Sequence, residues 1–155
     1  MAAVTSVMRV QQILLAQLNA VLRDHRLTFP RYEALMLLSF TRDGALPLGK
    51  LGERLQVHRT SVTNIVDKLE QDGFARRVPH VSDRRATLAE ITDEGRRVAQ
   101  RATLDMNGAA FSLSALQPEE QEQLTSLLEA VRRGAGDFRV DDGPDGDAGD
   151  RPTAA

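Results

Sequence analysis

The sequence predicts a mainly α-helical fold that carries one small β-hairpin. Apolar residues recur at intervals of three and four along most of the chain, which is the pattern of amphipathic helices. Residues 74–91 instead contain two short alternating segments around a polar loop, the pattern of a hairpin. Aromatic residues make up only 4% of the 155 residues and apolar residues 41%, so the core is expected to be aliphatic, as in helical proteins.

Two helices are predicted in the N-terminal part of the chain. Residues 4–26 place their apolar side chains on one face, at Val7, Val10, Leu14, Leu18, Val21 and Leu22. A second helix begins after Thr28, because threonine is a preferred N-cap residue. Pro30 suits the first turn, where its missing N–H costs little. Asp43-Gly44 is expected to end this helix.

The next two helices are joined by a short turn. Residues 48–55 form the first, and Val57-His58 makes the turn. Residues 59–72 form the second, which Gly73 ends because glycine readily adopts the left-handed conformation found after helices. The inward residues of these two helices are Leu48, Leu51, Leu55, Val62, Ile65, Val66 and Leu69.

The hairpin and two further helices complete the predicted fold. Residues 74–78 and 86–91 form the strands, and the segment from Pro79 to Arg85 is the loop between them. Thr92-Asp93-Glu94 begins a fifth helix that runs to about residue 112, with a bend expected at Asn107-Gly108. A sixth helix begins at Pro118 and ends at Gly134. Residues 139–155 are too polar to be buried, and we expect a disordered acidic tail.

The distribution of charge is more informative than the net charge of −2. Residues 134–155 carry six aspartates and two arginines, whereas residues 48–101 carry eleven basic and eight acidic groups. Positive charge therefore surrounds the short helix pair and the hairpin, which favours a nucleic-acid partner.

Several classes of function are excluded or unsupported. The chain has no cysteine, which excludes disulfides, thiol redox sensing and Cys-ligated zinc. No apolar run reaches the roughly 18–20 residues of a membrane span, and no signal peptide is recognisable, so we expect a cytoplasmic protein without a membrane partner. The three histidines lack metal-ligand spacing, and neither a nucleophile elbow nor a phosphate-binding loop is present. We expect no catalytic residue, no metal and no cofactor.

The order of helix, turn, helix and basic hairpin is that of a winged helix-turn-helix, in which the second helix reads DNA in the major groove. With its apolar face inward, the helix over 59–72 presents a polar face to solvent. The predicted DNA-binding residues on that helix are Arg59, Thr60, Ser61, Thr63, Asn64 and Lys68.

Two segments resemble the multiple-antibiotic-resistance regulator (MarR) family of bacterial transcription factors. LGKLGERLQVHRTSVTNIVDKLEQDGFARR is similar to that family's helix-turn-helix, and SDRRATLAEITDEGRR to its wing and following helix. The resemblance implies a homodimer formed by residues 4–26 and 93–135, with residues 28–92 as the DNA-binding lobe. Two such lobes would straddle a pseudo-palindromic operator. It also implies a repressor. Many members of the family release DNA when a small-molecule effector binds to them.

The resemblance assigns roles to individual residues. It favours Thr60, Ser61 and Asn64 as base readers, although the family often has arginine where Asn64 stands; asparagine pairs with adenine, whereas arginine prefers guanine. At the wing tip it places Arg85 in the minor groove, Asp83 in an ion pair that holds Arg85, and Arg84 on a phosphate. One of two strand residues, Arg76 or Arg77, is expected to contact the DNA backbone.

Other interpretations remain open at this stage. The polar helix face and the wing tip are also consistent with ordinary solvated residues, and the domain with a winged-helix protein-interaction module or a nonspecific DNA-coating protein. The acidic tail could compete with DNA for the basic surface or merely confer solubility. Phe29, Tyr32, Met36 and Met106 are either lining residues of an effector pocket or plain core, and no ligand can be named.

Overall fold

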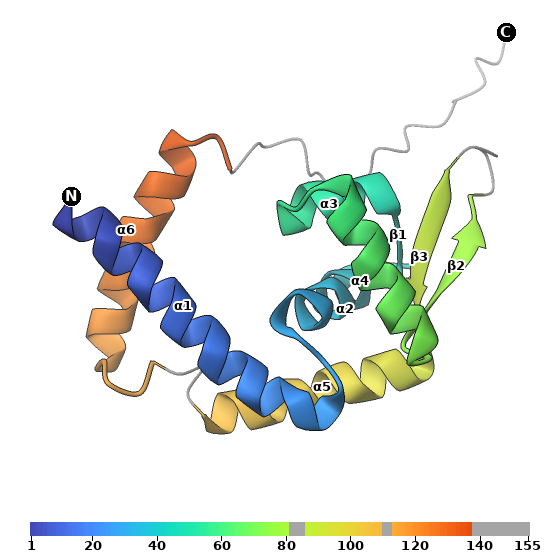
Figure 1. Cartoon of the computed structure of the whole chain (residues 1–155), viewed down its shortest axis with the longest axis horizontal. Coiled ribbons are helices and arrows are strands. Elements are labelled where there is room, and N and C mark those ends of the chain that lie inside the picture. Colours follow the sequence, from blue (N-terminus) through green and yellow to red (C-terminus); the bar gives the residue numbers. More distant parts are fainter. Residues whose placement is uncertain (81–85, 110–112, 138–155) are drawn as a thin grey trace, which may run out of the picture. The chain divides into compact units, whose positions relative to one another are not determined.

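The structure is a computed structural model that describes residues 1–80, 86–109 and 113–137. The described chain divides into two units, Met1–Ser114 and Ala115–Ala155. The first contains five α-helices, one short 3₁₀ helix and three strands, and the second contains one helix (Figure 1). The predicted fold class, helical with a small β-hairpin, is confirmed.

The first helices lie close to their predicted positions. Helix α1 spans Ala2–Leu22 and continues as the 3₁₀ turn η1, Arg23–His25. Helix α2 spans Phe29–Phe40. Thr28 is its N-cap residue, but its side chain makes no capping bond. Instead, the N–H of Phe29 donates to Oδ1 of Asn19 at 2.7 Å, so a side chain of α1 caps α2. Helix α2 ends before Asp43, with Thr41 as its C-cap.

The sheet has one more strand than predicted. Strand β1, Ala45–Pro47, pairs antiparallel with β3, Thr87–Ile91, which in turn pairs antiparallel with β2, Ala75–Pro79. The strand order is β1-β3-β2, so the predicted hairpin is confirmed but the prediction of two strands alone was wrong. A three-residue segment that contains proline is too short to show alternation, and pairing with β3 makes it a strand.

The helix-turn-helix lies within one residue of its predicted bounds. Helix α3 spans Leu48–Leu55 and α4 spans Arg59–Gln71. The two helices pack closely at Gly52, where a Cβ atom would lie 2.7 Å from Cγ2 of Val62. After α4, Gly73 adopts a φ of +75°, the left-handed conformation expected of the residue that ends the helix.

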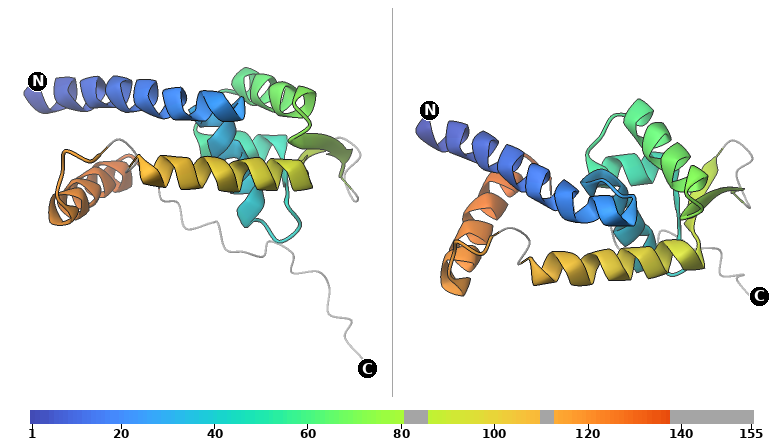
Figure 2. Two further views of the ribbon diagram at one scale, coloured as in Figure 1. Left: turned by 90° about the horizontal axis from the view of Figure 1, so that it is seen from below. Right: turned by 60° about the horizontal axis from the view of Figure 1, so that its bottom comes forward.

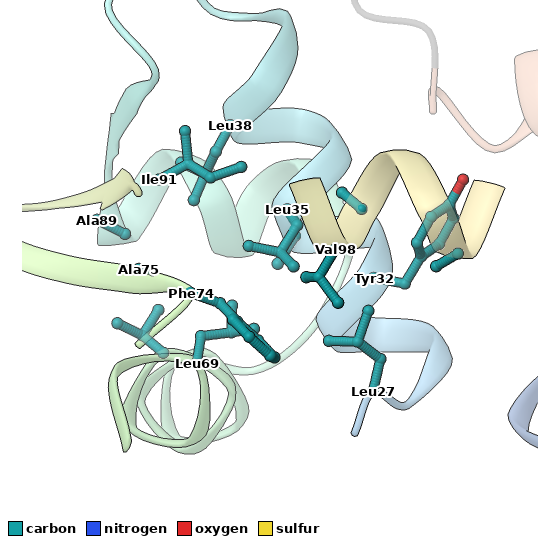
Figure 3. Packing of buried hydrophobic residues seen from close by; sticks show 14 of the residues in the cluster. Leu27, Tyr32, Leu35, Leu38, Leu69, Phe74, Ala75, Ala89, Ile91 and Val98 are labelled. Atoms are coloured by element: carbon teal, nitrogen blue, oxygen red, sulfur yellow. The ribbon is translucent and has the colours of Figure 1, made fainter. Parts of the chain in front are cut away.

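One apolar core joins the helices and the sheet of the first unit. Figure 3 shows Leu35 of α2, Leu69 of α4 and Val98 of α5 meeting inside it, together with Phe74, which directly precedes β2. Helix α5, Asp93–Gly108, contacts both α1 and α2 (Figure 2). It ends at Gly108, so the predicted continuation through a bend toward residue 112 was wrong; residues 110–112 lie outside the described part of the chain.

Two of the four candidate effector-pocket residues lie in the core, and the pocket interpretation stays a prediction. Tyr32 and Met106 are buried core side chains, and the Tyr32 hydroxyl lies 2.8 Å from Oγ1 of Thr103. Phe29 and Met36 are partly buried and pack against the same core.

The second unit is built on α6, Pro118–Gly134, which begins and ends where predicted. Its first turn is fixed by a reciprocal capping box between Gln117 and Glu120. None of its residues is buried in its own unit, and two of its large apolar side chains are mostly exposed, Leu127 at 69% and Val131 at 71%.

Candidate nucleic-acid interface

Helix α4 separates its buried and exposed faces as the sequence predicted. Val62, Val66 and Leu69 are buried, and Ile65 is half-buried. All six predicted DNA-binding residues of this helix are exposed, namely Arg59, Thr60, Ser61, Thr63, Asn64 and Lys68. The helix therefore presents one continuous polar face to solvent.

Four of these six side chains make no hydrogen bond within the part of the chain that the structure describes: those of Arg59, Thr60, Ser61 and Asn64. By contrast, the Thr63 hydroxyl donates to the carbonyl of Arg59 at 3.2 Å. The ammonium of Lys68 donates to Oε1 of Gln71 at 2.7 Å. The three groups that the family resemblance favours as base readers thus keep their donors and acceptors available for a partner.

A hollow lies on each side of this face. One, of about 780 Å³, is bounded by α3, the start of α4 and the end of the hairpin, including Glu53, Arg59 and Thr87. The other, of about 620 Å³, lies between the start of α2 and α4, and Arg31 and Asn64 are among its lining residues. The major groove of B-DNA is wide enough to admit an α-helix such as α4.

The hairpin follows α4 directly and forms the wing (Figure 1). It is closed at its described end by the N–H of His80, which donates to the carbonyl of Ala86 at 3.1 Å. The predicted tip residues Asp83, Arg84 and Arg85 lie outside the described residues. Their contacts with DNA stay a prediction.

The two strand arginines occupy different environments. Arg76 donates from Nε and a terminal nitrogen to both carboxylate oxygens of Glu90 on β3, at 3.1 and 2.8 Å. Arg77 instead reaches α4, where its terminal nitrogens lie 2.7 Å from Asp67 and 2.6 Å from Glu70. The side chain of Arg76 is 64% exposed and that of Arg77 only 26%. Both are therefore paired within the protein, and Arg77 is the less accessible.

The ion pairs change the acidity of the carboxylates. The pKa of Glu70 is held below its ordinary value of 4.5, first by the backbone N–H of Arg77 and then by its guanidinium. The pKa of Glu90 is lowered in the same way by hydrogen bonds from Arg76. Both carboxylates are therefore ionised at neutral pH and hold their arginines.

A joint connects the end of α4 to the start of α5. The N–H of Thr92 donates to the carbonyl of Phe74 at 3.0 Å, and its hydroxyl donates to the carbonyl of Gly73 at 2.7 Å. The same hydroxyl oxygen accepts the N–H of Gly95 at 3.0 Å, which caps α5. The sequence predicted that Thr92 begins a helix, but it gave no sign of the two bonds back to the end of the reading helix.

A small hollow of about 280 Å³ lies next to this joint, between η1 and α5. Its lining residues are Asp24, His25, Arg26, Phe74, Glu94, Val98 and Arg101. No group of three or more potential metal ligands occurs among the described residues. No helix in the described ranges is long and apolar enough to span a membrane.

The chain can now be compared with known proteins. The MarR family model matches residues 27–87. Sco5413, a MarR family transcriptional regulator from Streptomyces coelicolor, is 49% identical, with a TM-score of 0.84 over 88% of this chain and 95% of that one. Sco3205, a MarR family regulator from the same organism solved in complex with DNA, is 25% identical, with a TM-score of 0.79 over 92% and 94%.

A third relative, the uncharacterized HTH-type transcriptional regulator YkoM of Bacillus subtilis, is 35% identical over 100 residues. That alignment covers 64% of each chain, slightly less than two thirds of YkoM. The likeness to Sco5413 extends over nearly the whole of that protein, in sequence and in structure. The chain belongs to the MarR family and is a DNA-binding transcriptional regulator.

Proposed function

We propose that this protein is a homodimeric repressor that binds a pseudo-palindromic operator in double-stranded DNA and is released by a small-molecule effector. It acts in the cytoplasm and has no enzymatic activity. The observation that carries the proposal is the exposed polar face of α4, with a hollow on each side. On this face the side chains of Thr60, Ser61 and Asn64 form no hydrogen bond with the described residues. The complex of Sco3205 with DNA supports the same partner for this chain.

In this proposal, residues 28–92 form the DNA-binding lobe and α4 lies in the major groove. Thr60, Ser61 and Asn64 read base edges, and Arg59, Thr63 and Lys68 lie on the same exposed face and contact the DNA beside them. The amide of Asn64 can pair bidentately with adenine, so we expect an A·T pair at the position it reads.

The wing supplies the second set of contacts. Arg85 enters the adjacent minor groove, Asp83 holds it through an ion pair, and Arg84 binds a phosphate. Of the two strand arginines, Arg76 is the better phosphate contact because its side chain is far more exposed than that of Arg77.

The dimer is formed by the N-terminal helix and by residues 93–135. In support, the first half of α1 has five large apolar side chains that the rest of the first unit leaves exposed, namely Val4, Val7, Met8, Val10 and Ile13. Helix α6 likewise exposes Leu127 and Val131 in its own unit. Pairing two chains would bury these residues and set two reading helices about one turn of DNA apart.

The hollow beside the joint supports an effector site. It lies between the turn after α1 and the start of α5, and Phe74, between α4 and β2, forms part of its wall. A molecule bound there would therefore touch both the dimerisation helices and the DNA-binding lobe.

The salt dependence of binding tests this proposal. A duplex is first selected from a random-sequence pool, and its affinity is measured by fluorescence anisotropy over a range of salt concentrations. We expect the affinity of the wild type to fall steeply with salt and the slope to decrease by about one unit in Arg85→Ala, because one phosphate-region contact is lost. A protein-interaction module would yield no selected duplex, and an unchanged slope would contradict the wing assignment.

A further inference from the structure

We propose that Arg77 is a positioning residue, which binds Asp67 and Glu70 of α4 and thereby holds strand β2 and the wing in one orientation to the reading helix. This inference rests on the proposed function, because the orientation matters only if the wing and α4 meet the same duplex.

The first argument is the direction of the two neighbouring arginines. Successive side chains of a strand point to opposite faces of a sheet, so Arg76 and Arg77 cannot serve the same partner. Arg76 stands opposite Glu90 in the register of the hairpin and pairs with it there. Arg77 leaves the sheet and connects it to α4. Only the second contact can set an angle between the wing and the helix.

The second argument is that the contact holds the backbone as well as the side chain. Strand β2 is at the edge of the sheet, so alternate N–H groups face away from β3. The N–H of Arg77 donates to Oε1 of Glu70 at 3.0 Å, while its guanidinium donates to Oε2 of the same carboxylate at 2.6 Å. One carboxylate therefore holds both the main chain and the side chain of one residue through charge-assisted bonds.

The third argument is the spread of the contact along the helix. The guanidinium of Arg77 reaches Asp67 at 2.7 Å and the carbonyl of Thr63 at 3.5 Å in addition to Glu70. These three helix residues are spaced by four and three positions and lie on one face of α4. A contact over two turns fixes the direction of β2 as well as its distance from the helix.

The wing amplifies any change at this point. At about 3.3 Å per strand residue, His80 lies roughly 10 Å from Arg77, so a rotation of about 10° moves the described end of the hairpin by nearly 2 Å. A shift of that size is enough to lose a hydrogen bond, whose accepted lengths vary by only about 0.5 Å. The DNA contacts proposed for the wing depend on the same orientation.

A double-mutant cycle on the selected duplex tests the proposal. In the wild type, Arg85→Ala should weaken binding by about tenfold or more. In an Arg77→Ala background the same change should cost less than about threefold, because a misplaced wing has already lost the contact. Arg76→Ala is the matched control, and in that background the full cost of Arg85→Ala should remain. Equal costs in all three backgrounds would overturn the proposal, since a purely stabilising role leaves the wing contact intact.

A second variant keeps the test decisive if Arg77→Ala does not fold. Glu70→Gln removes the charge that holds Arg77 without shortening the side chain. A positioning role predicts that this variant binds the selected duplex more weakly. If Arg77 were itself a phosphate contact, removing a nearby negative charge would strengthen binding, and that result would overturn the proposal.

Hydrogen exchange without DNA separates failure of this inference from failure of the proposed function. The amide of Arg77 should exchange about tenfold faster in Glu70→Gln than in the wild type, and unchanged exchange would show that the carboxylate does not hold the strand. If the pool yields no selected duplex, the proposed function fails, whereas additive costs on a duplex that the wild type does select overturn the positioning role alone.

Discussion

Gly95 is the position where a single methyl group should disturb the link between the reading helix and α5. A Cβ atom there would lie 2.0 Å from the carbonyl oxygen of Phe74 and 2.9 Å from Cγ1 of Ile91. The carbonyl group of Phe74 cannot easily move away, because it accepts a hydrogen bond from the N–H of Thr92 at 3.0 Å. We predict that Gly95→Ala destabilises the protein and weakens DNA binding by displacing α5 from the end of α4.

The magnitude follows from the size of the overlap. Carbon–oxygen contacts need about 3.3 Å, so the start of α5 has to move by roughly 1 Å. Overpacking of this kind costs about 1–3 kcal/mol and occasionally more. The better helix propensity of alanine offsets at most about 1 kcal/mol of this destabilisation. We expect a net loss of about 2 kcal/mol in the free energy of unfolding, which corresponds to a fall in Tm of about 4–8 °C.

Thermal unfolding followed by circular dichroism measures this effect. Gly49→Ala is the matched control, since Gly49 is also helical and a Cβ atom there would meet nothing within 4 Å. That control should unfold at the wild-type temperature or slightly above it. If Gly95→Ala and Gly49→Ala had the same Tm, the close approach of α5 to Phe74 would not constrain the fold, and the reasoning would be refuted.

Three further predictions concern the reading helix, acid stability and the tail. Asn64→Ala should cost about 1–3 kcal/mol of binding at one position in each half-site, measured on a panel of base-substituted duplexes; an equal loss on every sequence would make Asn64 a backbone contact. Because its pairing lowers the folded-state pKa of Glu70, that carboxylate stabilises the fold above its unfolded pKa of about 4.5, and the contribution is lost as the pH falls through the lower folded pKa. Urea unfolding should therefore show that acidification from pH 7 to below 4 destabilises the wild type more than Glu70→Gln, and equal losses would argue against the pairing. Deleting residues 139–155 should change Tm by less than about 2 °C, whereas a larger fall would show that the tail packs on the protein.

Most of the fold could be predicted because its elements carry strong local signals. The helix pair over 48–55 and 59–72 shows regular apolar spacing and a glycine at its end, and the structure has both helices within one residue of these bounds. Strand β1 could not be predicted, because its three residues become a strand only through pairing with β3, which is more than forty residues away.

The candidate site likewise has features that the sequence predicts and features that it does not. The exposed face of α4 follows from periodicity alone, since burying Val62 and Val66 turns Asn64 outward. The partners of Arg77 could not be predicted, because Asp67 and Glu70 precede a turn whose geometry decides which strand residue meets the helix. From the sequence, Arg76 and Arg77 had the same expected role. Only the tertiary structure shows that Arg76 pairs within the sheet and Arg77 with the helix.

The most direct test of the account is whether the protein distinguishes one DNA sequence from another. Fluorescence anisotropy would compare the wild type on DNA from upstream of its own gene with a scrambled duplex of the same composition, near physiological salt. The account predicts a preference of about a thousandfold or more, with two protomers on each operator. Equal and weak binding to that duplex, to the scrambled one and to any sequence selected from a random pool would contradict it.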